Sequence, residues 1–282
     1  NVEQGNRLEG LPVAILSEAK LKANSLDQEG WSFTLKAPCW IPFMESCVDR
    51  SLREKMYHAY VTRASECGKD EFDNSTTIIE ILSARHEKSK LLGFDSFAHL
   101  SFATKMAVEP QRALDLLKQL SDRARSRAVS EFEMLNDYAS SRLGMHDLMP
   151  WDISFVAQKI KEERYSFKDE DLRQHFPLRK VMSGLFDLLG SLYGISVVDQ
   201  STTAWDPNVQ LLAVNNRAGN LIGYFYMDLF ARDGKRPGAW MDDAIGRWKT
   251  ERHTQLPVAY LVCNFPSQGA AASDAYLSHG EV

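Results

Sequence analysis

The longest helical pattern in the chain is EPQRALDLLKQLSDRARSRAVSEFEMLNDYASSRLG, which occupies residues 109–144. Pro110 suits the first turn of a helix, where its missing N–H would have no partner in any case. Apolar side chains keep helical spacing along the stretch, at Leu114, Leu117, Ala124, Ala128, Phe132 and Leu135. At 1.5 Å per residue the helix would be about 50 Å long, a length typical of a wall in a helical bundle.

Two earlier stretches also predict helices. One is LREKMYHAYVTRAS, at residues 52–65, in which Leu52, Met56 and Tyr60 share one helical face. The stretch DNSTTIIEILSARHEKSKLLG, at residues 73–93, begins with residue types that cap helices and ends at a glycine stop. Further helical patterns continue to VMSGLFDLLGSLYG, at residues 181–194. The first region, residues 1–194, is therefore predicted to be helical.

The pattern changes near residue 195. VQLLAVNNRAGNLIGYFYMDL, at residues 209–229, indicates two strands joined by a turn rich in Asn and Gly. GAWM, at residues 238–241, and PVAYLVCNF, at residues 257–265, indicate further strands. The fold class is therefore predicted to be mainly α, with a small, antiparallel-rich β-sheet in the second region, residues 195–282.

The charge balance and the cysteines narrow the class of protein. Lys and Arg number 33 against 38 Asp and Glu, a net charge of −5, and this mild acidic excess argues against binding to nucleic acid. No apolar run approaches the roughly 18 residues that a membrane span needs. None of the four cysteines forms a C-x-x-C pair, so we expect free thiols in a reducing cytoplasm.

The pair His86-Glu87 raises the question of a zinc site. A helical H-E-x-x-H site needs a second imidazole four residues on, and that position is Lys90, whose ammonium would repel a dication. His86 continues the stripe of Ile78 and Leu82, so we predict a core-facing histidine with a hydrogen bond across the bundle. No other histidine pair has this spacing, and no nucleophile motif is present.

The stretch RDGKRPGAWMDD, at residues 232–243, allows two interpretations. One is a charged hairpin tip that leads into an ordinary strand. The other is an exposed sheet edge that docks an extended peptide, because Pro237 and Gly238 favour an edge over a central strand. Asp242 and Asp243 are interpreted as solvated charges at the strand end rather than as catalytic groups.

Eight motifs in order identify a family. They are LEGLP, EGWSFTL, LREKMYHAYVTRAS, DNSTTIIEILSARHEKSKLLGF, ATKMA, PWDISF, GYFYMDLFARDGKRPGAWMDD and PVAYLVCNF. Together, over essentially the whole chain, they resemble the thimet oligopeptidase-like family of zinc metallopeptidases. The resemblance implies a mainly α-helical ellipsoid whose deep channel admits short peptides, with a small sheet beside the active site. Residues 1–194 would then form channel wall, and residues 195–282 would begin the catalytic region.

The resemblance also implies where the chemistry lies. In the family, two His of H-E-x-x-H and a Glu on a following helix hold Zn²⁺, and the signature Glu is the general base. That helix follows a segment similar to SHGEV, at residues 278–282. We therefore expect an internal fragment of a longer zinc enzyme, with no metal ligand and no catalytic residue of its own. It is predicted to bind no zinc and to be inactive alone, with short peptides as the partners of the parent protein.

The edge strand is the part of the family's site that this chain matches. By position, Gly238, Ala239 and Trp240 are predicted to bind substrate through main-chain groups. Two positions depart from the family pattern: Pro237 stands where Gly or Ser is common, which removes one donor, and Gly280 stands where an acidic residue is usual. A non-catalytic peptide-binding or scaffold module that uses the same edge is the alternative.

The resemblance also raises a question of stability. The family's sheet packs against the metal-bearing helix, so we expect the apolar faces of Phe225, Met227, Tyr260 and Val262 to lack partners in this chain. Exposure of such a side chain costs about 1.5–3 kcal/mol relative to burial. The isolated chain is therefore predicted to be marginally folded or prone to aggregation.

Overall fold

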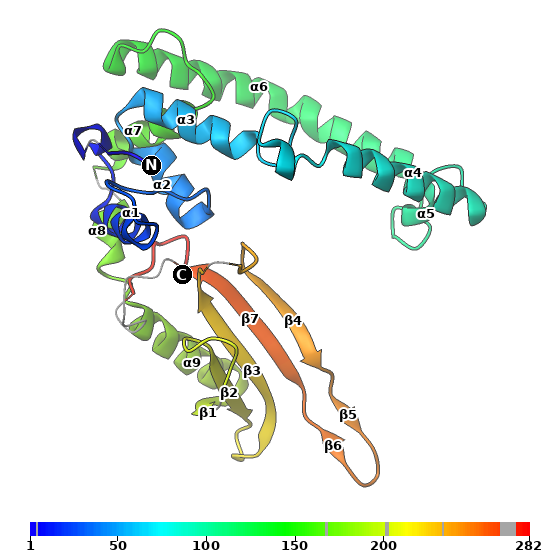
Figure 1. Ribbon diagram of the computed structural model, residues 1–282. Helices are drawn as coiled ribbons and strands as arrows, with labels where there is room; N and C mark the ends of the chain where they lie inside the picture. Colours follow the sequence, from blue (N-terminus) through cyan, green and yellow to red (C-terminus); the bar gives the residue numbers. More distant parts are fainter. Residues whose placement is uncertain (4, 167–168, 201–202, 233, 266–274) are drawn as a thin grey trace. The chain divides into compact units, whose positions relative to one another are not determined.

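The computed structural model describes residues 1–282 except 4, 167–168, 201–202, 233 and 266–274. The chain divides into two compact units, one of Cys47–Ile160 and one that combines Asn1–Ser46 with Lys161–Val282. Helices predominate, and the sheet belongs to the second of these units (Figure 1). The predicted mainly α fold with a small sheet near the C-terminal end is confirmed.

The unit Cys47–Ile160 consists of helices and their connections. These are α3 (Arg50–Val61), the short 3₁₀ turn η2 (Asp70–Phe72), α4 (Ser75–Leu91), α5 (Phe97–Phe102), α6 (Pro110–Leu143) and most of α7 (Ile153–Tyr165). The long predicted helix is α6, which has 34 residues, Pro110 in its first turn and Gly144 as a left-handed cap at φ 65°. The predicted stop of α4 is also confirmed, because Gly93 follows it at φ 78°.

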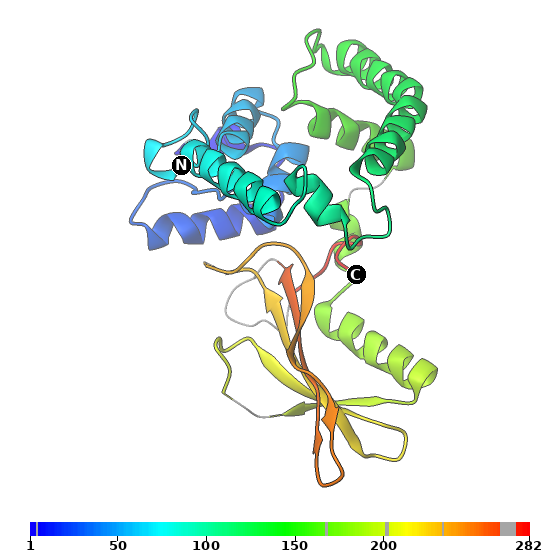
Figure 2. The ribbon, with the colours of Figure 1, turned by 90° about the vertical axis from the view of Figure 1, so that its right-hand side faces the viewer.

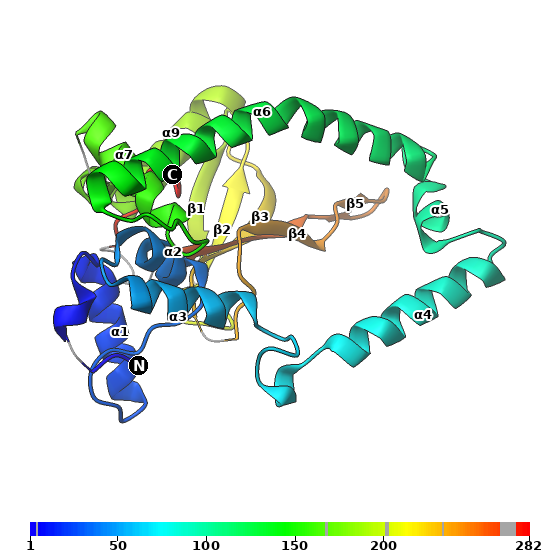
Figure 3. The same ribbon diagram turned by 90° about the horizontal axis from the view of Figure 1, so that it is seen from above.

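The apolar faces of α4 and α6 are open to solvent. Figure 3 shows the two helices diverging as separate arms that α5 joins, with no other helix of this unit between them. Ile78 and Leu82 of α4 are 53% and 58% exposed. We call the exposed apolar residues of these two helices the open helix faces, and they include Ile78, Ile79, Leu82, Leu114, Leu117, Leu120 and Phe132.

The prediction that His86 faces a core is wrong for the chain as described. His86 lies in the exposed part of α4, on the same open stripe as Ile78 and Leu82. The helical spacing correctly identified a face that can be buried, but spacing alone does not specify the element that covers it. In α4, Ser89 is the buried residue, and its hydroxyl donates to the His86 carbonyl at 2.7 Å.

The second unit combines short helices with the sheet. Its helices are η1 (Gly5–Leu8), α1 (Val13–Ser25), α2 (Ala37–Ser46), α8 (Asp169–Arg173) and α9 (Leu178–Tyr193). Its strands are β1 (Ser196–Gln200), β2 (Gln210–Asn215), β3 (Leu221–Phe230), β4 (Trp240–Ile245), β5 (Trp248–Lys249), β6 (Thr254–Gln255) and β7 (Val258–Phe265). The main sheet has the order β1-β2-β3-β7-β4, in which only β3 and β7 pair in parallel. The hairpin β5–β6 extends beyond it (Figure 2).

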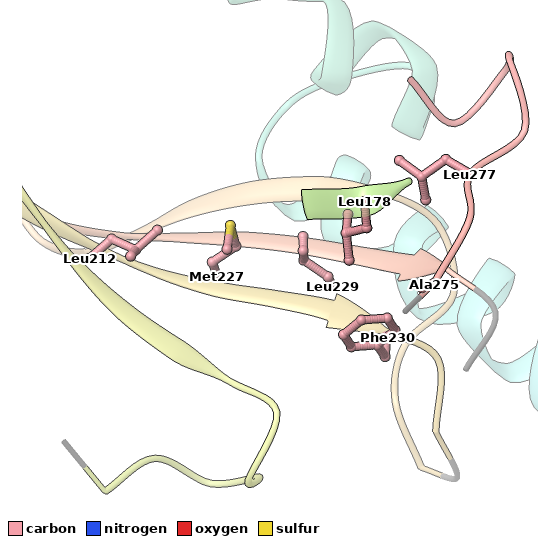
Figure 4. Close-up of a cluster of buried hydrophobic side chains, with 7 residues drawn as sticks. All are labelled: Leu178, Leu212, Met227, Leu229, Phe230, Ala275 and Leu277. Atoms are coloured by element: carbon pink, nitrogen blue, oxygen red, sulfur yellow. The ribbon is translucent and has the colours of Figure 1, made fainter. Parts of the chain in front are cut away.

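One face of the main sheet packs into a hydrophobic cluster (Figure 4). The buried members are Leu178, Leu212, Met227, Leu229, Phe230, Ala275 and Leu277. Val181, Met182 and Phe186 of α9 pack against this cluster, so α9 covers that face of the sheet. Alternate residues of β3 therefore point away from α9, which places Asp228 on the opposite face.

The prediction that the sheet lacks packing partners is wrong. Met227 and Val262 are each 4% exposed, and Phe225 packs against the cluster under α9. The Tyr260 ring stacks on the Tyr226 ring, with their centroids 5.8 Å apart. Elements of this chain therefore cover the side chains for which the sequence suggested a missing partner.

The change from helix to strand falls where it was predicted, because α9 ends at Tyr193 and β1 begins at Ser196. The division into channel wall and catalytic region at residue 195 remains a prediction. The two compact units are divided differently, because one of them combines two separate stretches of the chain. All four cysteines are free thiols, as predicted. Among the described residues, no helix combines the length and apolar character that crossing a bilayer requires.

Candidate peptide-binding edge strand

β4 forms one edge of the main sheet, and β7 is its single neighbour among the described strands. The two strands pair antiparallel, with Trp240 opposite Val262 and Asp243 opposite Ala259. The outer side of β4 therefore presents main-chain N–H and C=O groups to which no described strand pairs. Side chains after Trp240 are exposed, and Met241 is 77% exposed. β4 therefore lies at a sheet edge, as the second of the two interpretations requires, while peptide docking at this edge remains a prediction.

The three predicted binding residues lie at the start of this strand. Gly238 forms a bend at φ 92°, Ala239 follows it, and Trp240 is the first residue of β4. Pro237 precedes the strand, so its missing N–H removes nothing from the pairing of β4 with β7. Asp242 and Asp243 are exposed within β4, as expected for solvated charges.

A buried carboxylate forms hydrogen bonds with side chains of the loop that precedes β4. Asp228, near the end of β3, is 4% exposed. Arg232 donates from Nη1 to Asp228 Oδ1 at 2.7 Å and from Nη2 to Oδ2 at 2.8 Å. The Trp205 indole N–H donates to Oδ2 at 3.1 Å. A carboxylate taken out of water is stable only with such partners.

Lys235 is the third partner of Asp228, the second cation among them and the most buried of the three. Its side chain is 4% exposed, and its Nζ lies 2.8 Å from Asp228 Oδ1. The same ammonium donates to two carbonyls, that of Asp228 at 3.0 Å and that of Phe230 at 2.7 Å. All three donors of the ammonium are thereby used. Lys235 thus ties the loop after β3 back to the end of β3.

A residue of β7 also holds the loop that precedes β4 through hydrogen bonds. The Asn264 side-chain amide donates to the Arg236 carbonyl at 2.9 Å and to the Gly238 carbonyl at 2.7 Å. Gly238 is needed for its backbone, because φ 92° is a conformation that L residues rarely adopt, while a Cβ there would meet nothing within 4 Å. The residues just before β4 are therefore anchored from both β3 and β7.

The electrostatics of Asp228 follow from these contacts. Burial raises the pKa of this carboxyl, but the hydrogen bonds from Arg232, Lys235 and Trp205 outweigh burial and lower the pKa from 3.8 to about 2. Asp228 is therefore ionised at neutral pH. The same contacts raise the pKa of the Arg232 guanidinium. Asp228 and Arg232 therefore keep opposite charges near neutral pH, as a structural ion pair does, and the lowered pKa of Asp228 does not suit it to transfer protons there.

Aromatic rings flank the same face of the sheet. The Trp205 ring lies 5.0 Å from the Tyr226 ring and 5.7 Å from the Tyr260 ring, measured between centroids. Tilted contacts of this kind are favourable for aromatic pairs. Because the Trp205 indole also donates to Asp228, this cluster connects the rings to the charged loop.

The described residues do not fit a zinc site. No group of three or more His, Cys, Asp and Glu side chains among them is placed to hold a metal ion. His86 and Glu87 lie on the exposed part of α4, with Lys90 in the position of the second ligand. No chemical step through a metal is therefore assigned to the residues that the structure describes.

Sequence reasoning missed the residues that hold the edge strand, which are Asp228, Arg232, Lys235 and Asn264. One signal was present: Asp228 interrupts the otherwise apolar run FYMDLF at residues 225–230, with Arg232 four residues later. A charge inside a predicted buried strand requires partners, and nearby cations are the natural candidates. Asn264 carried no such signal, because its contacts depend on the strand order.

Comparison with known proteins identifies the family. The model of Peptidase family M3 matches residues 43–282. The chain belongs to peptidase family M3. The predicted resemblance to thimet oligopeptidase-like peptidases is confirmed by this match.

Curated relatives match the M3 chain over nearly its whole length. Oligopeptidase A of Salmonella typhimurium and that of Escherichia coli are each 42% identical over 279 residues, which cover 98% of this chain and 41% of the relative. Oligopeptidase A of Haemophilus influenzae is 42% identical over 285 residues, which cover 100% of this chain and 42% of the relative. The M3 chain thus spans about two fifths of the length of these relatives.

Proposed function

We propose that this chain is part of a zinc-dependent oligopeptidase, an endopeptidase that hydrolyses short peptides. Within that enzyme the chain supplies channel wall and the strand along which the substrate lies, and alone it is inactive. The observation that carries the proposal is the anchored edge strand β4, in a chain that is 42% identical to oligopeptidases A. The strand explains how a peptidase of this kind would hold an extended substrate.

Substrate recognition would proceed by strand addition. A peptide in extended conformation would pair with the free side of β4, and Gly238, Ala239 and Trp240 would contribute main-chain groups at its start. Main-chain hydrogen bonds are indifferent to side-chain identity, so the binding would tolerate many peptide sequences. Short peptides are accordingly the proposed partners, and neither nucleic acid nor a membrane has a role.

The channel wall would come from the helices of residues 1–194. The open helix faces support this proposal, because monomeric proteins rarely leave large contiguous apolar surfaces uncovered. The relatives contain more than half of their length outside the matched region, which is sufficient chain to cover those faces. In the complete enzyme the open helix faces would therefore lie against other parts of the same protein.

Zinc belongs, in this proposal, to the complete enzyme, and its ligands and the general base lie outside residues 1–282. The prediction is that the purified chain retains no stoichiometric zinc after dialysis and cleaves no quenched fluorescent peptide. One equivalent of tightly bound zinc together with chelator-sensitive turnover would overturn the assignment of inactivity.

The alternative function is a peptide-binding or scaffold module without catalysis. The exposed edge of β4 is the observation that favours it, because an edge can hold a peptide without cutting it. The nucleotide sequence that follows codon 282 discriminates between the two. An in-frame H-E-x-x-H helix supports the peptidase, whereas a stop codon at that position supports the module.

The proposed compartment is the cytoplasm. Four free thiols, two of them buried at Cys39 and Cys47, suit a reducing compartment, because an oxidising one favours disulfides. Cell fractionation with an antibody against the chain tests this assignment. Signal in the soluble cytoplasmic fraction is expected, and signal confined to a secreted or membrane fraction would contradict it.

A further inference from the structure

The connection between β3 and β4 joins two strands that are not neighbours in the sheet. The two strands are consecutive in the chain, but β7 lies between them in the sheet. The connection between them, of which the structure describes residues 231–232 and 234–239, therefore leads past the end of β7 to the start of β4. The Ala231 N–H donates to the Phe265 carbonyl at 2.9 Å, which starts the crossing at the last residue of β7.

Three side chains hold this crossing in place, and we call Asp228, Lys235 and Asn264 the loop clamp. Lys235 joins the middle of the crossing to the Asp228 carboxylate and to the carbonyls at the end of β3. Asn264 joins the second half of the crossing to β7 through the carbonyls of Arg236 and Gly238. The last contact lies two residues before the first residue of β4.

The loop clamp is separate from the packing that stabilises the sheet. Met227 and Leu229 point into the cluster under α9, whereas Asp228 lies between them in sequence and points to the other face. Cys263 and Phe265 pack against the same cluster, and Asn264 lies between them. Loss of a clamp contact would therefore release the crossing and leave the hydrophobic cluster intact.

We propose that Asp228, Lys235 and Asn264 are positioning residues that hold the start of β4 in the geometry required for an extended peptide to pair with it. This inference rests on the proposed function. An edge strand whose first residues are already ordered binds a peptide without the cost of ordering them, which is the general advantage of preorganisation. The side chains of the clamp act through β4 and do not themselves contact the peptide.

The test uses the monomeric fraction of the 282-residue chain and two clamp variants. Lys235→Met removes the buried ammonium, and Asn264→Ala removes two hydrogen bonds without leaving a buried charge behind. Lys249→Met is the matched control, because Lys249 is an exposed lysine of β5, the strand that follows β4 in the chain. Amide hydrogen exchange is measured by mass spectrometry, and the dissociation constant of a short fluorescent peptide is measured by anisotropy.

We expect the clamp variants to change the chain only around the start of β4. Each clamp variant should exchange amides of residues 236–245 about tenfold faster and bind the peptide about tenfold more weakly, because at least one hydrogen bond to the loop is lost. Amides of β2 (Gln210–Asn215) should exchange at the unchanged rate, which a general loss of structure would not allow. The control should match the unchanged chain in both measurements. If Lys235→Met fails to fold, the measurements on Asn264→Ala alone provide the test.

The outcomes separate the two claims. If the unchanged chain binds no peptide, the proposed function fails, and the positioning role fails with it. If the unchanged chain binds the peptide and both clamp variants bind it equally well, the positioning role alone is rejected.

Discussion

Arg53 and Asp152 form a buried ion pair across 99 residues of sequence. The Arg53 Nη2 lies 2.7 Å from Asp152 Oδ1, and the two side chains are 1% and 0% exposed. Arg53 also donates to the carbonyls of Cys47 and Val48, and Arg50 donates to Asp152 as well. The pair therefore joins the start of α3 to the start of α7 within the unit Cys47–Ile160.

Replacement of one partner should destabilise this unit strongly. Arg53→Met leaves the Asp152 carboxylate with one cation instead of two and removes the hydrogen bonds that Arg53 donates to the carbonyls of Cys47 and Val48, so the free energy of unfolding should fall by about 3–5 kcal/mol. Urea titration followed by helix circular dichroism measures the loss. Arg127→Met is the matched control, since the Arg127–Glu131 pair is exposed and such pairs contribute under about 1 kcal/mol. Equal stability of the two variants would contradict the role given to Arg53.

Acid should weaken the loop clamp. The pKa of Asp228 is lowered from 3.8 to about 2 in the folded chain. A carboxylate whose folded-state pKa is lowered contributes stability above its unfolded-state pKa and loses that contribution as the pH falls through the folded-state pKa. The contribution should therefore be complete above about pH 4 and mostly lost by about pH 2.

The pKa of Asp152 is also lowered, so acid affects that group as well. Asp152 is present in both the unchanged chain and Asp228→Asn, so the difference in stability between these two proteins reports on Asp228 alone. The unchanged chain should be the more stable at neutral pH, and the difference in free energy of unfolding should shrink between about pH 4 and pH 2. Urea titrations across that range provide the measurement. A difference that stays constant with pH would show that Asp228 does not act through its charge.

Gly238→Ala should disturb the start of β4. The backbone there has φ 92°, which strains an alanine although its Cβ would meet no atom within 4 Å. We expect a loss of about 1 kcal/mol in the free energy of unfolding and weaker peptide binding. Gly246→Ala serves as the control, because Gly246 has equally open surroundings without a positive φ. If both variants behave alike, the left-handed bend is not what the site requires.

The open helix faces should limit the solubility of the isolated chain. We expect Leu82→Lys combined with Leu117→Lys to raise the monomer fraction without lowering the thermal midpoint, because both side chains are more than half exposed. Light scattering and a thermal scan measure the two quantities. Glu87→Lys, an exposed charge change on α4, should leave the monomer fraction unchanged. A sharp, reversible transition in a monodisperse sample of the unchanged chain would remove the basis for this prediction.

Local signals in the sequence predicted the elements well. Pro110 and the apolar spacing located α6, and the Pro237-Gly238 pair located an edge strand. These predictions succeeded because they depend on backbone chemistry within a few residues, namely the missing N–H of proline and the freedom of glycine.

Long-range packing was predicted poorly. The apolar stripe predicts a core position for His86, and the family resemblance predicts that Met227 lacks a partner, because the family's sheet packs against the metal-bearing helix. In the structure α9 covers Met227, and the stripe of His86 is open. The loop clamp was missed for a related reason: Asn264 reaches the Gly238 carbonyl only because β7 and β4 are neighbours in the sheet, an order that no local pattern encodes.

The proposed role of this chain is to supply a working channel wall and substrate strand to a zinc oligopeptidase. Its most direct test is a graft in which the chain replaces the matched 279-residue region of Escherichia coli Oligopeptidase A. Turnover of a quenched fluorescent peptide is measured with and without a chelator, and bound zinc is quantified in the same sample. We expect chelator-sensitive hydrolysis by the graft, and weaker hydrolysis with a raised KM when Asn264→Ala is included. A folded graft that holds one equivalent of zinc and hydrolyses no peptide would show that this chain does not fill the proposed role.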